Sequence, residues 1–239
     1  MKPADHIAAL RRDSNRIAIG AEGRLDRIVP SCPGWRVADL VWHVGIVHMF
    51  WQMVARGALS GPEAWSEPDR PTDDDLLSWF RDGVDRSASV LDSLDPDKPA
   101  WTWGHRRNVG FIRRRVAQET AVHCWDTGSA VEANEPIEQT IAEDGVDEFL
   151  DEVLPSLSPD LDGPAQTICL RAHDITAEWT IRAGEGSTHL TRARGHADAT
   201  VTGTASDLLL LLWGRRSAAR VQVDGNLTAL QRFLSRTEF

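Results

Sequence analysis

The chain has 239 residues, of which 41% are hydrophobic, and a formal net charge of −10 at pH 7. A hydrophobic fraction of this size is ordinary for a folded protein and excludes a globally disordered chain. The acidic balance argues against a general binder of nucleic acids or of anionic membrane surfaces.

Composition also predicts where the protein works. No apolar run approaches the roughly 20 residues that a membrane helix needs, and the first residues hold no apolar segment of the signal-peptide type. Three cysteines, Cys32, Cys124 and Cys169, stand at irregular spacing without a CxxC motif, which is typical of reduced thiols. We therefore expect a cytoplasmic protein with no nucleic acid and no membrane as partner, and either a monomer or a homodimer.

Helical periodicity dominates the first two-thirds of the sequence. Apolar side chains recur every three to four residues, most clearly after a turn at residues 29–35 that contains two prolines and a glycine. The pattern predicts helices at about residues 5–17, 37–54, 72–94, 110–131 and 140–153. Helices of this length joined by loops predict an antiparallel four-helix bundle.

The pattern changes near residue 160. Residues 154–164 contain three prolines and a glycine, which is typical of a boundary between domains. Beyond them, short β-prone segments with glycine-rich turns alternate with two helical segments, at about residues 205–213 and 227–235. We predict an α+β protein with a helical bundle at 1–158 and a smaller α+β domain at 159–239.

Two residues on the fourth predicted helix, Glu119 and His123, point to a metal. Side chains four residues apart lie on the same face of a helix. Ile112, Val116, Glu119 and His123 follow one another at steps of four, three and four residues, so the carboxylate and the imidazole share the apolar face. A buried carboxylate is costly unless it is paired or bound to a cation.

His43 has the same peculiarity on the second predicted helix, because it lies in the apolar stripe between Leu40 and Val47. Two imidazoles and one carboxylate can make a three-ligand site with an open fourth position, as in catalytic zinc proteins. The alternative remains open at this point, since a core histidine is more often a hydrogen-bonded structural residue. An E-x-x-x-H pair alone is also common on surface helices.

Two further residues have open interpretations. Asp126, three residues after His123, suits a carboxylate that orients a metal-bound imidazole, and it equally suits an exposed surface acid. His48 lies one turn beyond Val44 and either lines the cavity or packs as an ordinary helix residue.

Three segments resemble the mycothiol-dependent maleylpyruvate isomerase family. Residues 29–43, VPSCPGWRVADLVWH, resemble its "PGW…ADL…H" opening, and residues 115–126, RVAQETAVHCWD, resemble its second ligand motif. Residues 203–215 and 223–225 resemble parts of its smaller C-terminal domain. The resemblance implies a DinB-like metal-binding bundle in which His43, Glu119 and His123 bind one divalent ion, usually zinc.

The resemblance also implies mycothiol as a thiol cosubstrate. Coordination to a divalent metal deprotonates a thiol that is otherwise only a few per cent ionised at pH 7. Addition of the thiolate to the double bond of maleylpyruvate would leave a single bond free to rotate, and its expulsion would give the trans isomer. With another electrophile the adduct would persist, and the protein would be a mycothiol S-transferase.

Anionic intermediates need cationic partners. By resemblance, Arg215 in the Trp-Gly-Arg motif of the second domain faces the anionic substrate, although it also suits a surface arginine after a helix. Arg115, one turn before Glu119, is our candidate for cofactor binding. It belongs to a run of Arg106, Arg107, Arg113, Arg114 and Arg115, and such a run is usually a solvated face. Two other functions stay open: a non-catalytic metal- or thiol-sensing module, and a metal-dependent hydrolase with His48 as its base.

Overall fold

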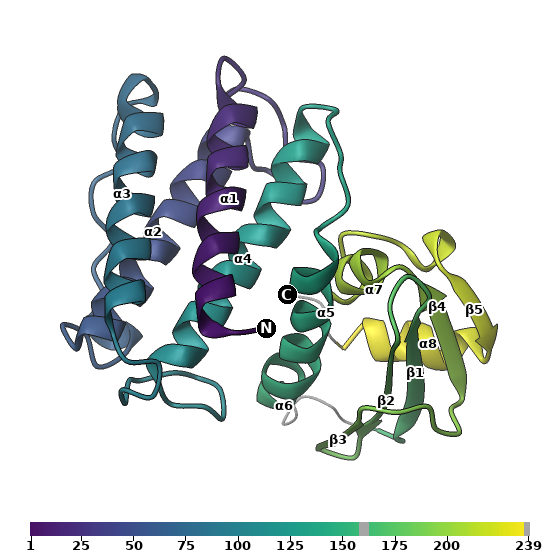
Figure 1. Ribbon diagram of the computed structural model, residues 1–239. Helices are drawn as coiled ribbons and strands as arrows, with labels where there is room; N and C mark the ends of the chain where they lie inside the picture. The colour runs from purple at the N-terminus through teal and green to yellow at the C-terminus, as the bar shows by residue number, and fades with distance from the viewer. Residues whose placement is uncertain (158–162, 237–239) are drawn as a thin grey trace. The chain divides into compact units, whose positions relative to one another are not determined.

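The computed structural model describes residues 1–157 and 163–236 and divides into two compact units, Met1–Ile137 and Glu138–Phe239. The first unit is helical, and the second combines helices with a mixed sheet (Figure 1). The predicted α+β class, with a helical bundle followed by a smaller α+β part, is therefore confirmed.

The first unit is a bundle in which α1 and α2 each pack against both α3 and α4. Its elements, in chain order, are α1 (Pro3–Ala21), α2 (Val37–Arg56), the short η1 (Pro62–Ala64), α3 (Asp73–Ser93) and α4 (Val109–Ala130). Each long helix lies within a few residues of its prediction, because each carries an apolar stripe of helical period.

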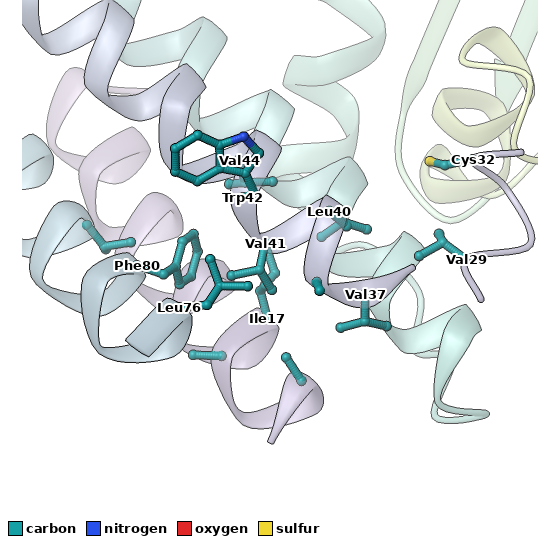
Figure 2. Close-up of a cluster of buried hydrophobic side chains, with 14 residues drawn as sticks. Ile17, Val29, Cys32, Val37, Leu40, Val41, Trp42, Val44, Leu76 and Phe80 are labelled. Atoms are coloured by element: carbon teal, nitrogen blue, oxygen red, sulfur yellow. The ribbon is translucent and has the colours of Figure 1, made fainter. Parts of the chain in front are cut away.

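Part of the bundle core is shared by α1, α2 and α3, and Figure 2 shows its side chains pointing toward one another. Ile17, Val41 and Phe80, one from each helix, are all at most 1% exposed. Among the described helices, α2 alone is long and apolar enough to span a membrane by length and composition. Core helices pass the same test, and α2 packs against α3 and α4 here.

The second unit begins with α5 (Gln139–Glu148), which runs through the π-helical turn η2 (Phe149–Val153) into α6 (Leu154–Ser156). The described strands form a sheet of order β3-β2-β1-β4-β5, in which β1 is antiparallel to β2 and parallel to β4. The remaining elements are β1 (Gln166–Ala172), β2 (Ala177–Gly184), β3 (Ser187–Thr191), β4 (Ala199–Gly203), α7 (Ala205–Leu212), η4 (Ala218–Arg220), β5 (Gln222–Gly225) and α8 (Leu227–Leu234).

Alternate residues of the central strands form the core of this unit. Ile168, Leu170, Ile181 and Val201 are at most 1% exposed, and α7 and α8 pack against β1 and β4. Trp179 is also buried, and its indole nitrogen donates a hydrogen bond of 3.1 Å to the Asp147 carboxylate. Alternation of buried and exposed residues is what a sheet with one covered face requires.

One strand differs from the prediction. The edge strand β3 is absent from it because Leu190 is the one apolar residue of this strand, so its sequence lacks the apolar alternation of a core strand. The units divide at residues 137 and 138, because α5 packs against α7 of the second unit. The predicted boundary at residues 158 and 159 lies outside the described residues.

The close approach of α2 and α3 generates a testable prediction. A Cβ atom on Gly45 would lie 2.3 Å from the Trp79 ring, so Gly45→Ala should lower the free energy of unfolding by about 1–3 kcal/mol through overpacking. Gly83→Ala, on α3, is the matched control, because nothing lies within 4 Å of its Cβ position. That variant should be about 0.5–1 kcal/mol more stable, since alanine is the better helix former. Urea unfolding measures both, and equal effects would contradict the close approach.

Candidate metal centre

Two helices of the bundle bring three metal-ligating side chains together. His43 comes from α2, and Glu119 and His123 come from α4, one helical turn apart. Glu119 Oε1 lies 3.2 Å from His43 Nε2 and 3.3 Å from His123 Nε2. One ligand atom from each residue lies within 4.8 Å of the other two.

These separations fit a metal ion. Metal–ligand bonds of about 2.0–2.2 Å at a tetrahedral angle place neighbouring ligand atoms about 3.3–3.6 Å apart. The same carboxylate oxygen is at nearly this distance from both imidazole nitrogens. Two imidazoles and a carboxylate suit zinc, and they also suit several other divalent ions.

The charges of the three groups are strongly coupled. Burial alone would raise the pKa of Glu119, but hydrogen bonds with His123 and His43 and the charge of Arg115 hold it well below its usual range. Burial alone would lower the pKa of His123, but hydrogen bonds with Asp126, Cys32 and Glu119 raise it well above its usual range. In the metal-free protein the carboxylate is therefore ionised and the His123 imidazole is protonated. Binding of a cation to His123 would release this proton.

Each α4 ligand has its second polar atom held by a neighbour. Arg115 Nη2 lies 3.4 Å from Glu119 Oε2, which leaves Oε1 directed at the two histidines. His123 Nδ1 lies 2.9 Å from Asp126 Oδ2, which leaves Nε2 directed at the centre. Asp126 is fully buried, so of its two interpretations the exposed surface acid is wrong. Carboxylate–histidine pairs of this kind fix the tautomer and the ring orientation of metal ligands.

The arginine run divides into two parts. Arg106 and Arg107 are exposed, as a solvated face requires, whereas Arg113, Arg114 and Arg115 are buried, so that interpretation is wrong for these three. Arg113 donates to the carbonyl oxygens of Leu91 and Asp92, at 2.8 and 3.2 Å, near the end of α3. Arg115 contacts the candidate metal ligand Glu119. Arg115 therefore lies beside the candidate centre.

The loop before α2 contributes residues whose roles the sequence did not reveal. Ser31 Oγ donates a 2.5 Å hydrogen bond to Asp126 Oδ1, and Cys32 Sγ lies 3.7 Å from Oδ2. The Trp35 ring centroid lies 4.9 Å from that of His43 and 6.1 Å from that of His123. Residues 29–35 carried the family resemblance, but nothing in local spacing places them against α4.

His48 is fully buried and does not have the exposure that a general base needs. Its Nε2 lies 2.8 Å from Thr120 Oγ1 on α4, and its ring stacks on Phe80 at 6.1 Å. Burial lowers the pKa of His48 to about 3, with the Glu119 charge opposing part of the shift. The imidazole is therefore neutral at physiological pH and links α2 to α4.

Arg215 belongs to the second unit and lies just after α7. Its Nη1 donates a 2.8 Å hydrogen bond to the Trp213 carbonyl oxygen. Arg215 and Arg216 line a pocket of about 300 Å³ together with apolar side chains such as Leu211 and Leu234. Arg216 in turn pairs with Asp207 at 3.1 Å. The pocket thus offers guanidinium groups, which are the kind of group that binds small anions.

The candidate ligands differ in their access to solvent. The His43 and Glu119 side chains are 31% and 24% exposed, whereas the His123 side chain is 7% exposed. The centre is therefore buried on the side of His123 and accessible on the side of the other two ligands. A small molecule can approach from that accessible side.

The protein thus consists of a helical bundle and a small α+β unit. The bundle directs two imidazoles and a carboxylate at one point, where they could bind a metal ion. Profiles of known families match both parts. The mycothiol maleylpyruvate isomerase N-terminal domain matches residues 7–128, and the C-terminal domain of the same family matches residues 140–232. The chain belongs to the mycothiol-dependent maleylpyruvate isomerase family, which is a family of enzymes.

Solved structures agree with this assignment at the level of the fold. The crystal structure of the mycothiol-dependent maleylpyruvate isomerase has a TM-score of 0.67 at 14% identity and covers 95% of both chains. A histidine-to-alanine mutant of the mycothiol-dependent maleylpyruvate isomerase has a TM-score of 0.65 at 12% identity, with the same coverage. No curated protein matches the chain.

The buried neutral imidazole of His48 predicts a pH dependence of stability. Its folded pKa of about 3 lies below the ordinary value of 6.5, so between these values the unfolded chain binds one proton more than the folded chain. Stability should therefore fall as the pH is lowered through this window, by about 1.4 kcal/mol per pH unit for this group. Between pH 7 and pH 5, metal-free wild type should lose about 2 kcal/mol more than His48→Gln in urea unfolding. Identical losses in the two proteins would contradict the buried neutral state.

Proposed function

We propose that this protein is a metal- and mycothiol-dependent enzyme that isomerises maleylpyruvate or a related cis-unsaturated acid. A mycothiol S-transferase acting on another electrophile is the close variant of the same chemistry. The observation that carries the proposal is the spacing of His43, Glu119 and His123, at 3.2 and 3.3 Å through one carboxylate oxygen. Family membership supports the cosubstrate and the reaction class.

In this proposal His43, Glu119 and His123 hold one divalent ion, with zinc as the first choice. The bound ion would supply Lewis acidity, which lowers the pKa of a thiol that takes the remaining position. Access along the exposed sides of His43 and Glu119 supports entry of such a thiol. The chain's own Cys124 is unsuited to this role, because burial raises the pKa of its thiol to about 12.

Two buried residues act through the ligands. Arg115 restrains Glu119 Oε2, so the carboxylate presents one oxygen and leaves room for the thiol. Asp126 accepts a hydrogen bond from His123 Nδ1, and this bond would keep Nε2 directed at the centre once the incoming ion has displaced its proton. We therefore propose that Arg115 and Asp126 position the ligands. His48 holds α2 and α4 together through its hydrogen bond with Thr120.

Arg215 is our proposed partner of the substrate's negative charge. Addition of a thiolate to a conjugated acid builds an enolate, which a guanidinium stabilises. Arg215 lines a pocket and lies in the Trp-Gly-Arg segment on which the family resemblance rests. In this proposal the Arg215 guanidinium binds the negative charge of the substrate.

The two other functions are less well supported. A sensing module needs no path for substrate, whereas two of the three ligand side chains remain accessible. A hydrolase needs a base beside the centre, but His48 is fully buried with a pKa of about 3 and a bond to Thr120. Access and acid–base chemistry therefore both favour the thiol-dependent enzyme.

The ligand assignment predicts the metal content. Protein purified without added metal should carry about one divalent ion per chain by elemental mass spectrometry. His43→Ala and His123→Ala should each lose it, because two ligands hold a divalent ion poorly. His189→Ala, at an exposed position on β3, is the control and should keep the ion. Full occupancy in His123→Ala would show that the assignment is wrong.

The cosubstrate predicts a ligand-dependent stability. Mycothiol at 100 times its Kd should stabilise the metal-loaded protein by about 2.7 kcal/mol, which raises the temperature of thermal unfolding. The metal-free protein and glutathione serve as controls and should show a much smaller shift.

Turnover of maleylpyruvate to the trans isomer, followed by NMR, should require mycothiol and fall at least 100-fold in Arg215→Ala. Binding of mycothiol without turnover of any electrophile would favour the sensor, and mycothiol-independent hydrolysis would favour the hydrolase.

A further inference from the structure

Asp126 is a buried carboxylate that accepts hydrogen bonds from two separate parts of the chain. Its side chain is fully buried. His123 Nδ1 on the same helix donates to Oδ2 at 2.9 Å. Ser31 and Cys32, from the loop more than 90 residues earlier in the sequence, donate to Oδ1 at 2.5 Å and to Oδ2 at 3.7 Å. A buried carboxylate of this kind depends on its donors, because each one that is lost leaves the buried charge less well stabilised.

The loop that brings these donors is held in shape by its own backbone. The Val29 N–H donates to the Trp35 carbonyl oxygen at 2.9 Å, and the Cys32 N–H donates to the Val29 carbonyl oxygen at 3.1 Å. Gly34 takes a φ of 85°, in the left-handed region that favours glycine. Cys32 belongs to the same buried cluster as Val29, as Figure 2 shows. The loop therefore presents its hydroxyl and thiol to α4 from a fixed position.

The loop also touches the candidate ligands directly. The Trp35 ring stacks on His123 with an interplanar angle of 21° and meets His43 at 54°. His123 is thus fixed at one edge by Asp126 and on one face by Trp35. The loop restrains Asp126 and the His123 ring together.

We propose that Ser31 and Cys32 are positioning residues of the metal centre, which act through Asp126 to hold His123 in its metal-binding orientation. The proposal rests on the proposed function, because it takes His123 as a metal ligand. Cys32, His123 and Asp126 also lie close enough together to hold an ion of their own. We assign them to support of the first centre, because the 2.9 Å contact of His123 Nδ1 with Asp126 is a hydrogen-bond distance.

The test is the affinity for Co²⁺, measured by competition with a chelator at a temperature where every variant is folded. Ser31→Ala and Cys32→Ala should each weaken binding about 10-fold, as is usual when a partner of a metal ligand is lost. Ser31→Thr and Cys32→Ser keep a donor and should stay within about threefold of wild type. Ser66→Ala, in an exposed loop of the same unit, is the control and should leave the affinity unchanged.

A double-mutant cycle separates positioning from general packing. In an Asp126→Asn background, Ser31→Ala should have little further effect, because its route to His123 is already broken. An undiminished effect of Ser31→Ala in that background would overturn the proposal, as would affinities within twofold of wild type for both alanine variants. Binding of two ions per chain would also overturn it, in favour of a second centre at Cys32.

The same cycle, measured by urea unfolding of the metal-free protein, keeps this inference distinct from the proposed function. Non-additive effects of Ser31→Ala and Asp126→Asn are expected there. If wild type binds no Co²⁺, the proposed function fails and His123 positions no metal, so the inference fails with it. If wild type binds Co²⁺ but the metal-free effects are additive, the hydrogen-bond network is refuted while the proposed function stands.

Discussion

The centre depends on one carboxylate oxygen, Glu119 Oε1, which lies between two imidazole nitrogens contributed by two different helices. A carboxylate in this position is stable only with positive charge or hydrogen-bond donors around it. The surrounding residues supply both, with Arg115 on its second oxygen and histidines on its first. The packing of α2 against α4 and the buried contact of His48 with Thr120 keep the two helices in register for this arrangement.

Much of the fold was predictable because it follows from periodic patterns. The long helices and the strands β1, β2 and β4 carry apolar residues at regular spacing, and this spacing is visible in the sequence alone. The edge strand β5 has no buried residue but overlaps the alternating Val221-Gln222-Val223, whereas the edge strand β3 has Leu190 as its one apolar residue and shows no alternation. Whether α5 packs on the bundle or against α7 is decided by tertiary contacts, which no local pattern encodes.

The candidate site divides in the same way. His43, Glu119 and His123 were accessible from sequence, because polar residues within an apolar helical stripe are conspicuous. Ser31, Cys32 and Trp35 were not, since their contacts with α4 span more than 80 positions of the chain and obey no local period. The family resemblance included their segment, but only the fold shows that this segment contacts Asp126 and the rings of the candidate ligands.

The three candidate ligands all lie within the first unit, on helices whose other residues form its core. The candidate anion partner Arg215 lies in the second unit, on a turn between α7 and η4. Under the proposed function, the metal and the anion would therefore be bound by residues from different units of the chain. Substitutions around Arg215 would then change which anion is accepted and leave the three candidate ligands unaltered.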